Sequence, residues 1–513
     1  MTNHWTFKEG SAFSIGIMLI GLLLQLCIGP VKWSLAAWPV NFIVLLIYII
    51  GIIVMYTFHK KVNLFQWMMQ YTSAVPAIGI GALATMIYGI TNWEGTLSLW
   101  SFVLLYLWIT TILGLTTLKQ FARLIKQLTN PKLGPVTLSS SPRGGREGAF
   151  PRGGREGGAL LSHLGLFFSI TCATLGHADL QRLKMITYVD EPEWRAFDDE
   201  TKKVETLDLA IQLNKFTLEE YPAHGDMPPM PRRFASDVTV FTKDGKKIDA
   251  TIEVNKPLEV NGWNIYQYSY DTTLGGDSQT SVFELVHDPW LPYVFAGIYM
   301  LIAGAVLMMM SRWKLRWLWT IGVFVLAVCG IAYIFNEHEK TKELMPALQS
   351  PWFAPHVAIY MVCYTILGIA TIMAIWNLIP PLPPPKEVDC NQSAHKRTPI
   401  RTASPLLRRG MGRLDHLVYI GTALMTIGML FGALWAKEAW GHYWSWDPKE
   451  TWAAATWFFY LTYIHFRLIK PDKFKFACIL LIFTYCCLQM CWWGINYLPS
   501  AQGNSVHTYD LSK

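Results

Sequence analysis

Long runs of apolar residues, separated by short polar segments, recur along most of the chain. A helix needs about twenty apolar residues to cross roughly 30 Å of hydrocarbon, and the runs predict about eleven such spans. They lie near residues 13–29, 39–58, 73–90, 97–116, 159–177, 291–310, 316–335, 356–378, 414–434, 452–468 and 476–494. The pattern predicts an all-α polytopic membrane protein.

Residues 178–290 depart from this pattern because they are polar. Runs that alternate apolar and polar residues at the period of a strand are Val238–Phe241, Lys247–Val254, Trp263–Tyr270 and Thr280–Val286. Asp244-Gly245 and Asn261-Gly262 lie between runs and are typical of hairpin turns. We expect a small β-rich extracytoplasmic domain.

The basic residues predict the orientation, because Lys and Arg of short loops stay in the cytoplasm. Basic connections lie at 59–61, 123–132, 312–316, 397–413 and 467–475 and alternate with less basic ones. This places the N-terminus inside and the C-terminus outside. Met1–Gly10 lacks the basic start of a signal peptide, so we expect the first span to be retained.

Composition narrows the classes of protein and partner. With 52% hydrophobic residues, 15% charged residues and a mean hydropathy of +0.27, the chain is not a soluble globule throughout. The net charge of +7 follows from the cytoplasmic loops, so membrane lipid is an expected partner and nucleic acid is not. The nine cysteines form no Cys-x-x-Cys pair, which excludes a thiol oxidoreductase and a c-type cytochrome.

A nine-residue repeat marks the connection after the fourth span. Pro142–Gly148 recurs as Pro151–Gly157, and this Gly-rich polar sequence cannot form a core. We expect residues 131–158 to be a disordered cytoplasmic linker. The chain then divides into N-terminal spans (1–130), this linker, a region that holds the β-rich segment (159–335) and a C-terminal region (336–513).

Residues 435–452, the Trp-rich segment, contain five tryptophans in eighteen positions. Indole rings give rigid apolar area for a planar ligand, and the charges of Asp447, Lys449 and Glu450 suit polar groups at its edge. Aromatic residues also gather at the interface of any membrane protein, but such a belt does not need so compact a run. The segment predicts a site for a flat amphiphilic macrocycle such as haem.

Histidine is the commonest neutral axial ligand for haem iron, and two histidines flank the Trp-rich segment on the outer side. His356 begins the span 356–378, and His507 lies beyond the last span. We call these two residues the outer pair and expect them to ligate one haem.

Two further histidines lie at a common depth near the cytoplasmic leaflet. His465 follows Trp452 by thirteen residues, which at the rise of a helix is about 20 Å. This matches the depth of His163, near the inner start of the span 159–177. A lone histidine in a span would be costly, so we expect these two residues, the inner pair, to form a second haem site. His59 and His416 are the rivals for that role.

The run WGHYWSWDPKETW at Trp440–Trp452 resembles the WWD domain of the haem-handling superfamily, specifically the CcsA/ResC branch of system II cytochrome c biogenesis. The N-terminal half, with its β-rich segment and Asp288-Pro289-Trp290, resembles the CcsB/ResB partner. The whole chain thus resembles a fused CcsBA cytochrome c synthase of a bacterial inner membrane. Such proteins are understood to carry haem b (iron protoporphyrin IX) outward and attach it to apocytochrome c.

The resemblance implies ligand roles for His356, His507, His163 and His465. It also implies haem contacts for Trp440, Trp444, Trp446 and Trp452, and a place for Asp447 beside the reacting haem. Lys437 departs from the family, which commonly has Asn there, and so does the Ser-Val-His-Thr-Tyr run at 505–509.

The implied reaction is thioether formation. An apocytochrome presents Cys-x-x-Cys-His, its histidine displaces one iron ligand, and its two thiols add to the haem vinyl groups. Proteins that reduce the thiols or the haem are further expected partners. Two alternatives stay open: a membrane haem exporter without synthase activity, and a b-type electron-transfer subunit.

Overall fold

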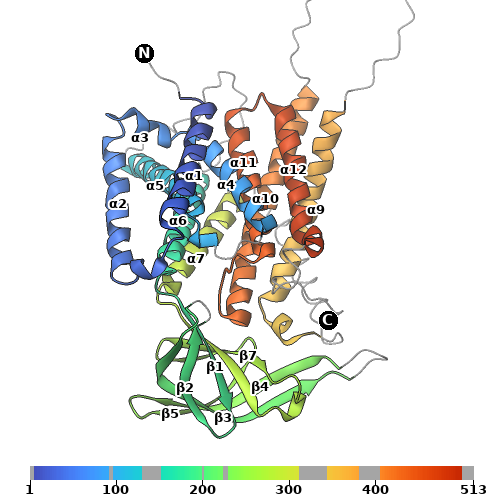
Figure 1. The fold of residues 1–513 in the computed structure, drawn as a ribbon. Helices are drawn as coiled ribbons and strands as arrows, with labels where there is room; N and C mark the ends of the chain where they lie inside the picture. The colour runs from blue at the N-terminus through green and yellow to red at the C-terminus, as the bar shows by residue number, and fades with distance from the viewer. Residues whose placement is uncertain are drawn as a thin grey trace, which may run out of the picture.

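A helical bundle and a β domain make up the computed structural model, which describes residues 5–91, 96–129, 152–198, 201–222, 229–310, 344–379 and 405–498 (Figure 1). The α-helices in these ranges are α1 (Phe7–Ile28), α2 (Val40–Phe58), α3 (Asn63–Met68), α4 (Tyr71–Thr91), α5 (Trp100–Thr129), α6 (Arg152–Gly176), α7 (Leu291–Met310), α9 (Phe353–Leu378), α10 (Pro405–Trp440), α11 (Pro448–Ile469) and α12 (Phe474–Trp492).

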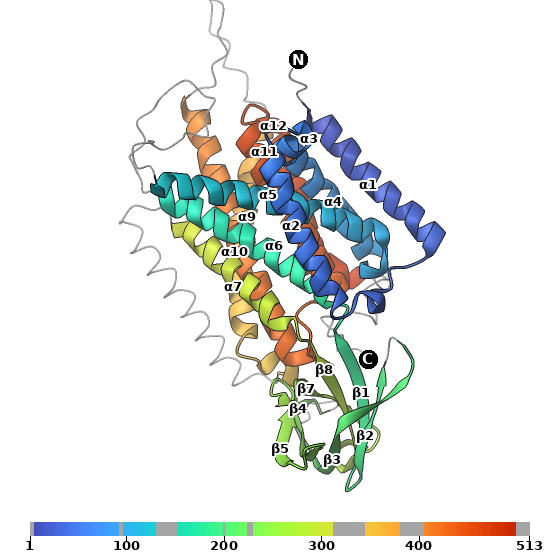
Figure 2. The ribbon, with the colours of Figure 1, turned by 90° about the vertical axis from the view of Figure 1, so that its left-hand side faces the viewer.

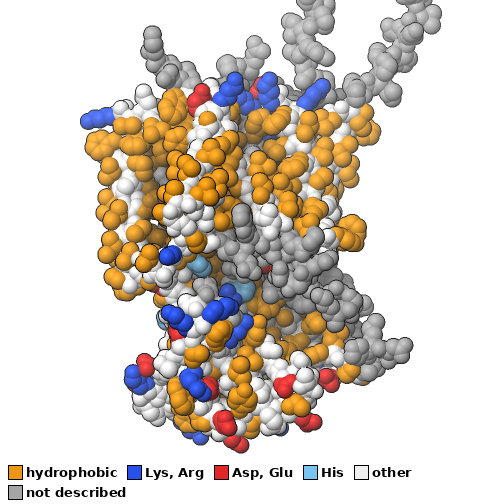
Figure 3. Space-filling model, in the orientation of Figure 1, with side chains coloured by type: hydrophobic (Ala, Val, Ile, Leu, Met, Phe, Trp, Pro, Cys, Tyr) orange, Lys and Arg blue, Asp and Glu red, His pale blue; other side chains and the backbone are white. Residues whose placement is uncertain are grey.

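Nine of the described helices are long and apolar enough to cross a membrane: α1, α2, α4, α5, α6, α7, α9, α10 and α12. They form one bundle whose apolar side chains cover its flank, while Lys and Arg gather at the end opposite the β domain (Figure 3). The prediction of a polytopic membrane protein is confirmed. The predicted span 316–335 lies outside the described residues, and the predicted span 452–468 lies in α11, which is not among these nine helices.

Helix α11 occupies the interior of the bundle. It packs against α4, α10 and α12, and most of its residues are buried, including Trp452, Phe458 and Tyr460. A helix that is buried on most sides is surrounded by protein rather than lipid. Ligand candidates on α11 therefore face other helices.

The repeat does not belong wholly to a linker. Helix α6 begins at Arg152, so the predicted linker boundary at 158 lies inside a helix. At Gly158 an added Cβ would come within 2.9 Å of the backbone nitrogen of Met308 on α7. The second copy of the repeat is thus helical from Arg152, although its glycines have poor helix propensity, and it leads directly into the contact between α6 and α7.

The β domain is an eight-stranded antiparallel sheet in the order β5-β4-β3-β2-β1-β8-β7-β6. Its strands are β1 (Gln181–Tyr188), β2 (Pro192–Asp198), β3 (Val204–Glu220), β4 (Pro231–Thr242), β5 (Lys247–Glu253), β6 (Leu258–Val260), β7 (Trp263–Tyr270) and β8 (Thr280–His287). The predicted strands and both predicted turns are confirmed. Gly245 and Asn261-Gly262 have the positive φ angles that these turns need.

Alternating burial along the strands produces the core of the β domain. Leu209, Ile211 and Leu213 on β3 are all buried, as expected when every second side chain points to one face. The sheet also curls. This is shown by Ser236 on β4, which donates a 2.7 Å hydrogen bond to Gln267 on β7, although the two strands are far apart in the strand order. The domain therefore has its own compact core.

Asp179 ties the β domain to the bundle. Its carboxylate accepts hydrogen bonds from the Trp38 backbone N–H at 2.6 Å, from Asn41 at 2.8 Å and from the Trp290 indole at 2.7 Å. Figure 2 shows the two connections between α6 and β1 and between β8 and α7 running side by side. Three segments far apart in the sequence thus meet at one side chain.

Candidate functional site

His163 and His465 lie side by side. The centres of their rings are 6.4 Å apart, and the ring planes differ by 60°. An imidazole nitrogen binds a transition metal at about 2 Å, so two rings that ligate one ion from opposite sides have their centres about 6 Å apart. The proximity expected from the depth estimate is therefore observed, at a separation that suits one shared iron.

Both rings of the inner pair use their Nδ1 atoms for hydrogen bonds. Nδ1 of His465 is 2.8 Å from the Leu461 carbonyl, one turn earlier on α11, and Nδ1 of His163 is 3.2 Å from Oε1 of Gln120 on α5. A carbonyl only accepts, so the Leu461 contact favours the proton on Nδ1 of His465 and leaves its Nε2 to bind a metal. Nε2 of Gln120 lies 3.1 Å from Nδ1 of His163, as near as Oε1, so this contact fits either tautomer of His163.

Tyr71 and Tyr56 lie next to two of the histidines considered for the inner site. The Tyr71 ring, at the start of α4, lies 6.4 Å from the His465 ring. His59, a predicted rival, instead stacks on Tyr56 of its own helix at 4.9 Å. His416 lies on α10, next to Asp415, whose carboxylate pairs with Arg467 at 2.9 Å.

His356 lies in the first turn of α9, at the end of the bundle that faces the β domain. Its Nδ1 atom is 2.8 Å from the Gly428 carbonyl on α10. A Cβ on Gly432 would come within 2.6 Å of Cε1 of His356, so only glycine leaves room for this ring. The Trp435 ring lies 5.9 Å away. His507, the predicted partner, lies outside the described residues.

The Trp-rich segment consists of two helix ends and a short loop. Trp435 and Trp440 belong to α10, and Trp452 belongs to α11. Residues 441–447 connect the helices, and Gly441 and Trp446 adopt positive φ. The loop is therefore much shorter than the segment, and it reverses the chain tightly.

Asp447 and Glu450 shape the start of α11. Oδ1 of Asp447 accepts hydrogen bonds from the backbone N–H groups of Lys449 at 2.8 Å and of Glu450 at 3.4 Å, with Pro448 at the first helical position. Glu450 accepts the Ser445 backbone N–H at 2.7 Å. These are the contacts of a capped helix N-terminus. The acidic residues of the motif thus have a structural role beside any role toward a ligand.

The tryptophans of the segment have two sets of neighbours. Trp440 packs on Trp435 at 4.9 Å, on the His356 side. Trp446 meets the Phe102 ring of α5 edge-on at 5.0 Å, and Trp452 lies against Gly89 of α4, where a Cβ would be 3.1 Å from the indole. The segment therefore binds the N-terminal helices to α10 and α11.

Two buried indole nitrogens suit a polar ligand group. Within the described ranges, Nε1 of Trp444 and Nε1 of Trp452 have no hydrogen-bond partner. A buried N–H without a partner is costly, so an acceptor supplied by a ligand would stabilise the site. The residues present therefore fit a large apolar ligand with polar substituents.

The Trp-rich segment also contacts the β domain. A Cβ on Gly441 would come within 3.0 Å of Tyr266 on β7, and Lys437 lies over the Tyr266 ring at 5.4 Å. Burial raises the pKa of the Asp288 carboxyl, and the electrostatic interaction with Lys437 opposes this effect without cancelling it. Burial, together with Asp288, likewise raises the pKa of Tyr443. Lys437 and the Asp288-Pro289-Trp290 run, both noticed in the sequence, are thus neighbours.

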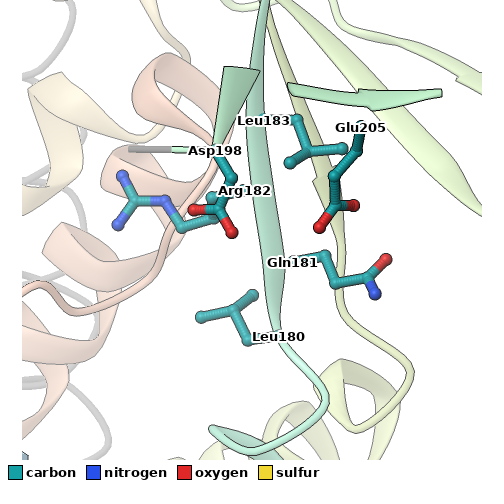
Figure 4. A pocket seen from close by; sticks show the side chains of 6 residues that line it. All are labelled: Leu180, Gln181, Arg182, Leu183, Asp198 and Glu205. Carbon is teal, nitrogen blue, oxygen red and sulfur yellow. The ribbon is translucent and has the colours of Figure 1, made fainter. Parts of the chain in front are cut away.

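A polar pocket of about 120 Å³ lies apart from these residues, around one end of β1 (Figure 4). Its lining consists of Leu180, Gln181, Arg182, Leu183, Asp198 and Glu205. No histidine or tryptophan takes part in it, and its volume is far too small for a macrocycle. The pocket therefore belongs to neither the inner nor the outer site.

Sequence reasoning missed Gln120 and Asp179. Gln120 lies four residues after the end of the apolar run 97–116, where a polar residue is typical of the end of a span, and Asp179 stands in the polar start of the β-rich segment. Nothing in either local pattern indicates a distant partner.

Comparison with known proteins divides the chain into two parts. Residues 152–279 match the ResB-like family, and residues 290–501 match the cytochrome c assembly protein family. The first match ends at 279 and the second begins at 290. The sequence pattern instead placed the boundary between the two regions after 335. The inner pair takes one histidine from each matched range.

Three curated relatives, each described as cytochrome c biogenesis protein CcsA, align with about a third of this chain. The protein of Porphyra purpurea is 33% identical over 37% of this chain and 66% of its own length. That of Guillardia theta is 35% identical, with 34% and 59% covered, and that of Chlamydomonas reinhardtii is 32% identical, with 34% and 45% covered. The chain spans less than two thirds of the length of these relatives.

Proposed function

Because this chain joins a ResB-like region to a cytochrome c assembly region in one polypeptide, we propose that it is a cytochrome c synthase of the system II type. It takes haem b from the cytoplasmic side, passes it to an outer site and attaches it to apocytochrome c. Haem is the cargo and the substrate, and the protein supplies binding, orientation and a protected site.

The observation that carries the proposal is the inner pair. Two histidines from α6 and α11, one from each matched range, lie 6.4 Å apart within the bundle. Histidines inside spans are rare and mark functional sites, and this spacing suits bis-histidine ligation of one iron. The pair would receive haem near the cytoplasmic leaflet.

The outer site is proposed around His356, with His507 as the second ligand. Gly432 leaves room for the His356 ring, and Trp435 and Trp440 lie next to it. The unpaired indole N–H of Trp444 would donate to a polar substituent of haem, whereas the Trp452 indole packs on Gly89 of α4 and would support the segment from behind. Asp447 holds the N-terminus of α11 and would thereby shape the loop beside the haem.

The sides of the membrane follow from charge. Lys and Arg gather at the end of the bundle away from the β domain (Figure 3), and basic residues stay in the cytoplasm. The β domain and the Trp-rich segment then face the outer compartment of a bacterial inner membrane, where apocytochrome is found.

The attachment step uses two ligand positions on the iron. In the proposed site, His356 stays close to the Trp-rich segment while the histidine of an incoming Cys-x-x-Cys-His sequence replaces the other ligand. The two cysteine S–H groups add across the two vinyl groups of haem, forming one C–S and one C–H bond each, with no net oxidation. The thiols must arrive reduced, which makes a thiol-reducing protein a further partner.

The test is production of covalent c-type cytochrome in a bacterial host that lacks its own assembly system. Expression of this chain with a c-type apocytochrome should yield haem that stays attached after denaturation, and the purified chain should show a low-spin haem b spectrum. His356→Ala and His507→Ala should each abolish most of this yield, and imidazole should partly restore it. Full yield in both variants would contradict the outer site.

The inner pair has its own controls. His163→Ala and His465→Ala should lower the haem content of the purified chain, whereas His59→Ala and His416→Ala should behave almost like the parent. Haem loss in His416→Ala with normal haem content in His465→Ala would show that the inner ligand lies on α10 and not on α11. A chain that holds haem but yields no covalent cytochrome would be an exporter, and haem that stays bound when apocytochrome is added would indicate an electron-transfer subunit.

A further inference from the structure

Gln120 on α5 lies within hydrogen-bond distance of the His163 ring on α6. Its Oε1 atom is 3.2 Å and its Nε2 atom 3.1 Å from Nδ1 of His163. A neutral imidazole that binds a metal through Nε2 carries its proton on Nδ1. In that tautomer the ring donates, and Oε1 of Gln120 is the acceptor.

We propose that Gln120 is a positioning residue of the inner haem site. It accepts the Nδ1–H of His163 and so holds the ring in the tautomer and orientation in which Nε2 is presented to iron. The inference rests on the proposed function. Groups that accept the second N–H of a metal-bound histidine fix its orientation and raise its basicity.

The two rings of the inner pair are held in different ways. His465 uses the Leu461 carbonyl of its own helix, which no side-chain replacement removes. The His163 ring also interacts with the Ala159 carbonyl, one turn earlier on α6. Gln120 adds a contact from another helix, and it therefore sets the direction of the ring relative to α5 as well as α6.

Gln120 precedes both ranges that match known families. Its helix is firmly placed, because α5 packs against α1, α4 and α6 and the Lys119 ammonium donates a 3.0 Å hydrogen bond to the Met69 carbonyl. The N-terminal helices thus contribute a side chain to a site whose ligands come from the two matched ranges. Helix α5 therefore has a role in haem binding in addition to its packing role.

The experiment isolates the inner haem in the full-length chain carrying His356→Ala, which disables the outer pair. Haem affinity is measured by absorbance titration and the midpoint potential by redox titration. Gln120→Leu should weaken haem binding about 10-fold or more. Gln120→Glu should keep haem but lower the midpoint potential, because a carboxylate acceptor makes the imidazole a stronger donor and favours Fe(III).

Thr117→Val is the matched control. Thr117 is buried on the same helix, one turn away, and its hydroxyl bonds the Leu113 carbonyl of α5 itself at 2.8 Å. Its replacement should change neither affinity nor potential. If Gln120→Leu fails to accumulate, the midpoint potential of Gln120→Glu still tests the inference, because this replacement preserves the size of the side chain.

Two outcomes would overturn the inference in distinguishable ways. If both Gln120 variants match Thr117→Val while His163→Ala loses haem, the Ala159 carbonyl alone orients the ring, and the proposed function stands without Gln120. If His163→Ala itself keeps full haem affinity, the inner site is wrong, and the proposed function loses its main support.

Discussion

Gly432 decides how closely the ring of His356 can approach α10. A Cβ at this position would lie 2.6 Å from Cε1 of His356, a distance that forces the ring to move. Gly432→Ala should therefore lower the yield of covalent cytochrome several-fold without removing any ligand atom.

The control for this substitution lies on the same helix. At Gly412 nothing lies within 4 Å of an added Cβ, so Gly412→Ala should leave the yield unchanged. The measurement is haem staining of the cytochrome at matched levels of both variants. Normal yield in Gly432→Ala would show that the position of His356 is not critical.

Two substitutions of Asp447 separate a structural role of its side chain from a chemical role of its charge. Asp447→Ala removes the acceptor for two backbone N–H groups at the start of α11, which should cost about 1 kcal/mol of stability. Asp447→Asn keeps a good cap. If the cap is what matters, thermal unfolding in detergent and cytochrome yield should both be near normal in Asp447→Asn and reduced in Asp447→Ala. Loss of yield in Asp447→Asn at normal stability would assign the charge a role toward haem.

At the scale of elements, α6 and α7 depend on small residues at their contact. A Cβ on Gly165 would lie 2.6 Å from both the Gly297 carbonyl oxygen and the Leu301 nitrogen. Gly165→Ala should therefore push the helices apart, at a cost of about 1–3 kcal/mol, and displace His163 two residues away. Thermal stability and haem content should fall together.

Gly157→Ala is the matched control on α6, because nothing lies within 4 Å of its added Cβ. It should be neutral or slightly stabilising, since alanine is the better helix former. Unchanged stability in Gly165→Ala would mean that the two helices tolerate a wider spacing than their contacts suggest.

At the scale of the whole molecule, Asp179 links the β domain to the bundle. Burial opposes ionisation of this carboxyl, but hydrogen bonds from Asn41, the Trp38 backbone and Trp290 outweigh it and hold its pKa below the usual value. A lowered pKa in the folded state means that the linkage is fully present above the ordinary Asp pKa near 4 and is lost as pH falls through the lower folded value.

Asp179→Ala should therefore destabilise the parent by about 1–3 kcal/mol at neutral pH, because three donors lose their acceptor. The difference in thermal midpoint between parent and variant should shrink below about pH 4. Protease sensitivity of the connections at 177–180 and 288–290 gives a second readout. A difference that persists unchanged at low pH would show that ionisation of Asp179 contributes nothing.

How far the sequence predicts each feature depends on the range of the interaction behind it. Hydrophobic runs identified the nine described spans, and alternation with Asp244-Gly245 and Asn261-Gly262 identified β4, β5, β7, β8 and two turns, because those signals depend on residues close together in the chain. The strands β1, β2, β3 and β6 were not predicted. The end of the linker was wrong, because Gly158 takes its environment from Met308 on α7. Intrinsic propensity could not reveal that contact.

The candidate site follows the same division. Depth along a helix is a local quantity, so counting residues brought His163 and His465 to one level. The Trp-rich segment was recognisable from its composition but not from its contacts, since Trp446 and Trp452 reach α5 and α4. His507 stays a prediction.

The sequence by itself determined that this protein crosses the membrane many times, carries a β domain and places histidines at two depths, because hydrocarbon thickness and strand period act on neighbouring residues. The tertiary structure alone decided that the inner pair would face each other at 6.4 Å, that Gln120 would reach His163 and that Asp179 would join three segments. Rotation of helices about their axes and the choice of packing partners come from side-chain fit between distant segments, and no local pattern encodes them.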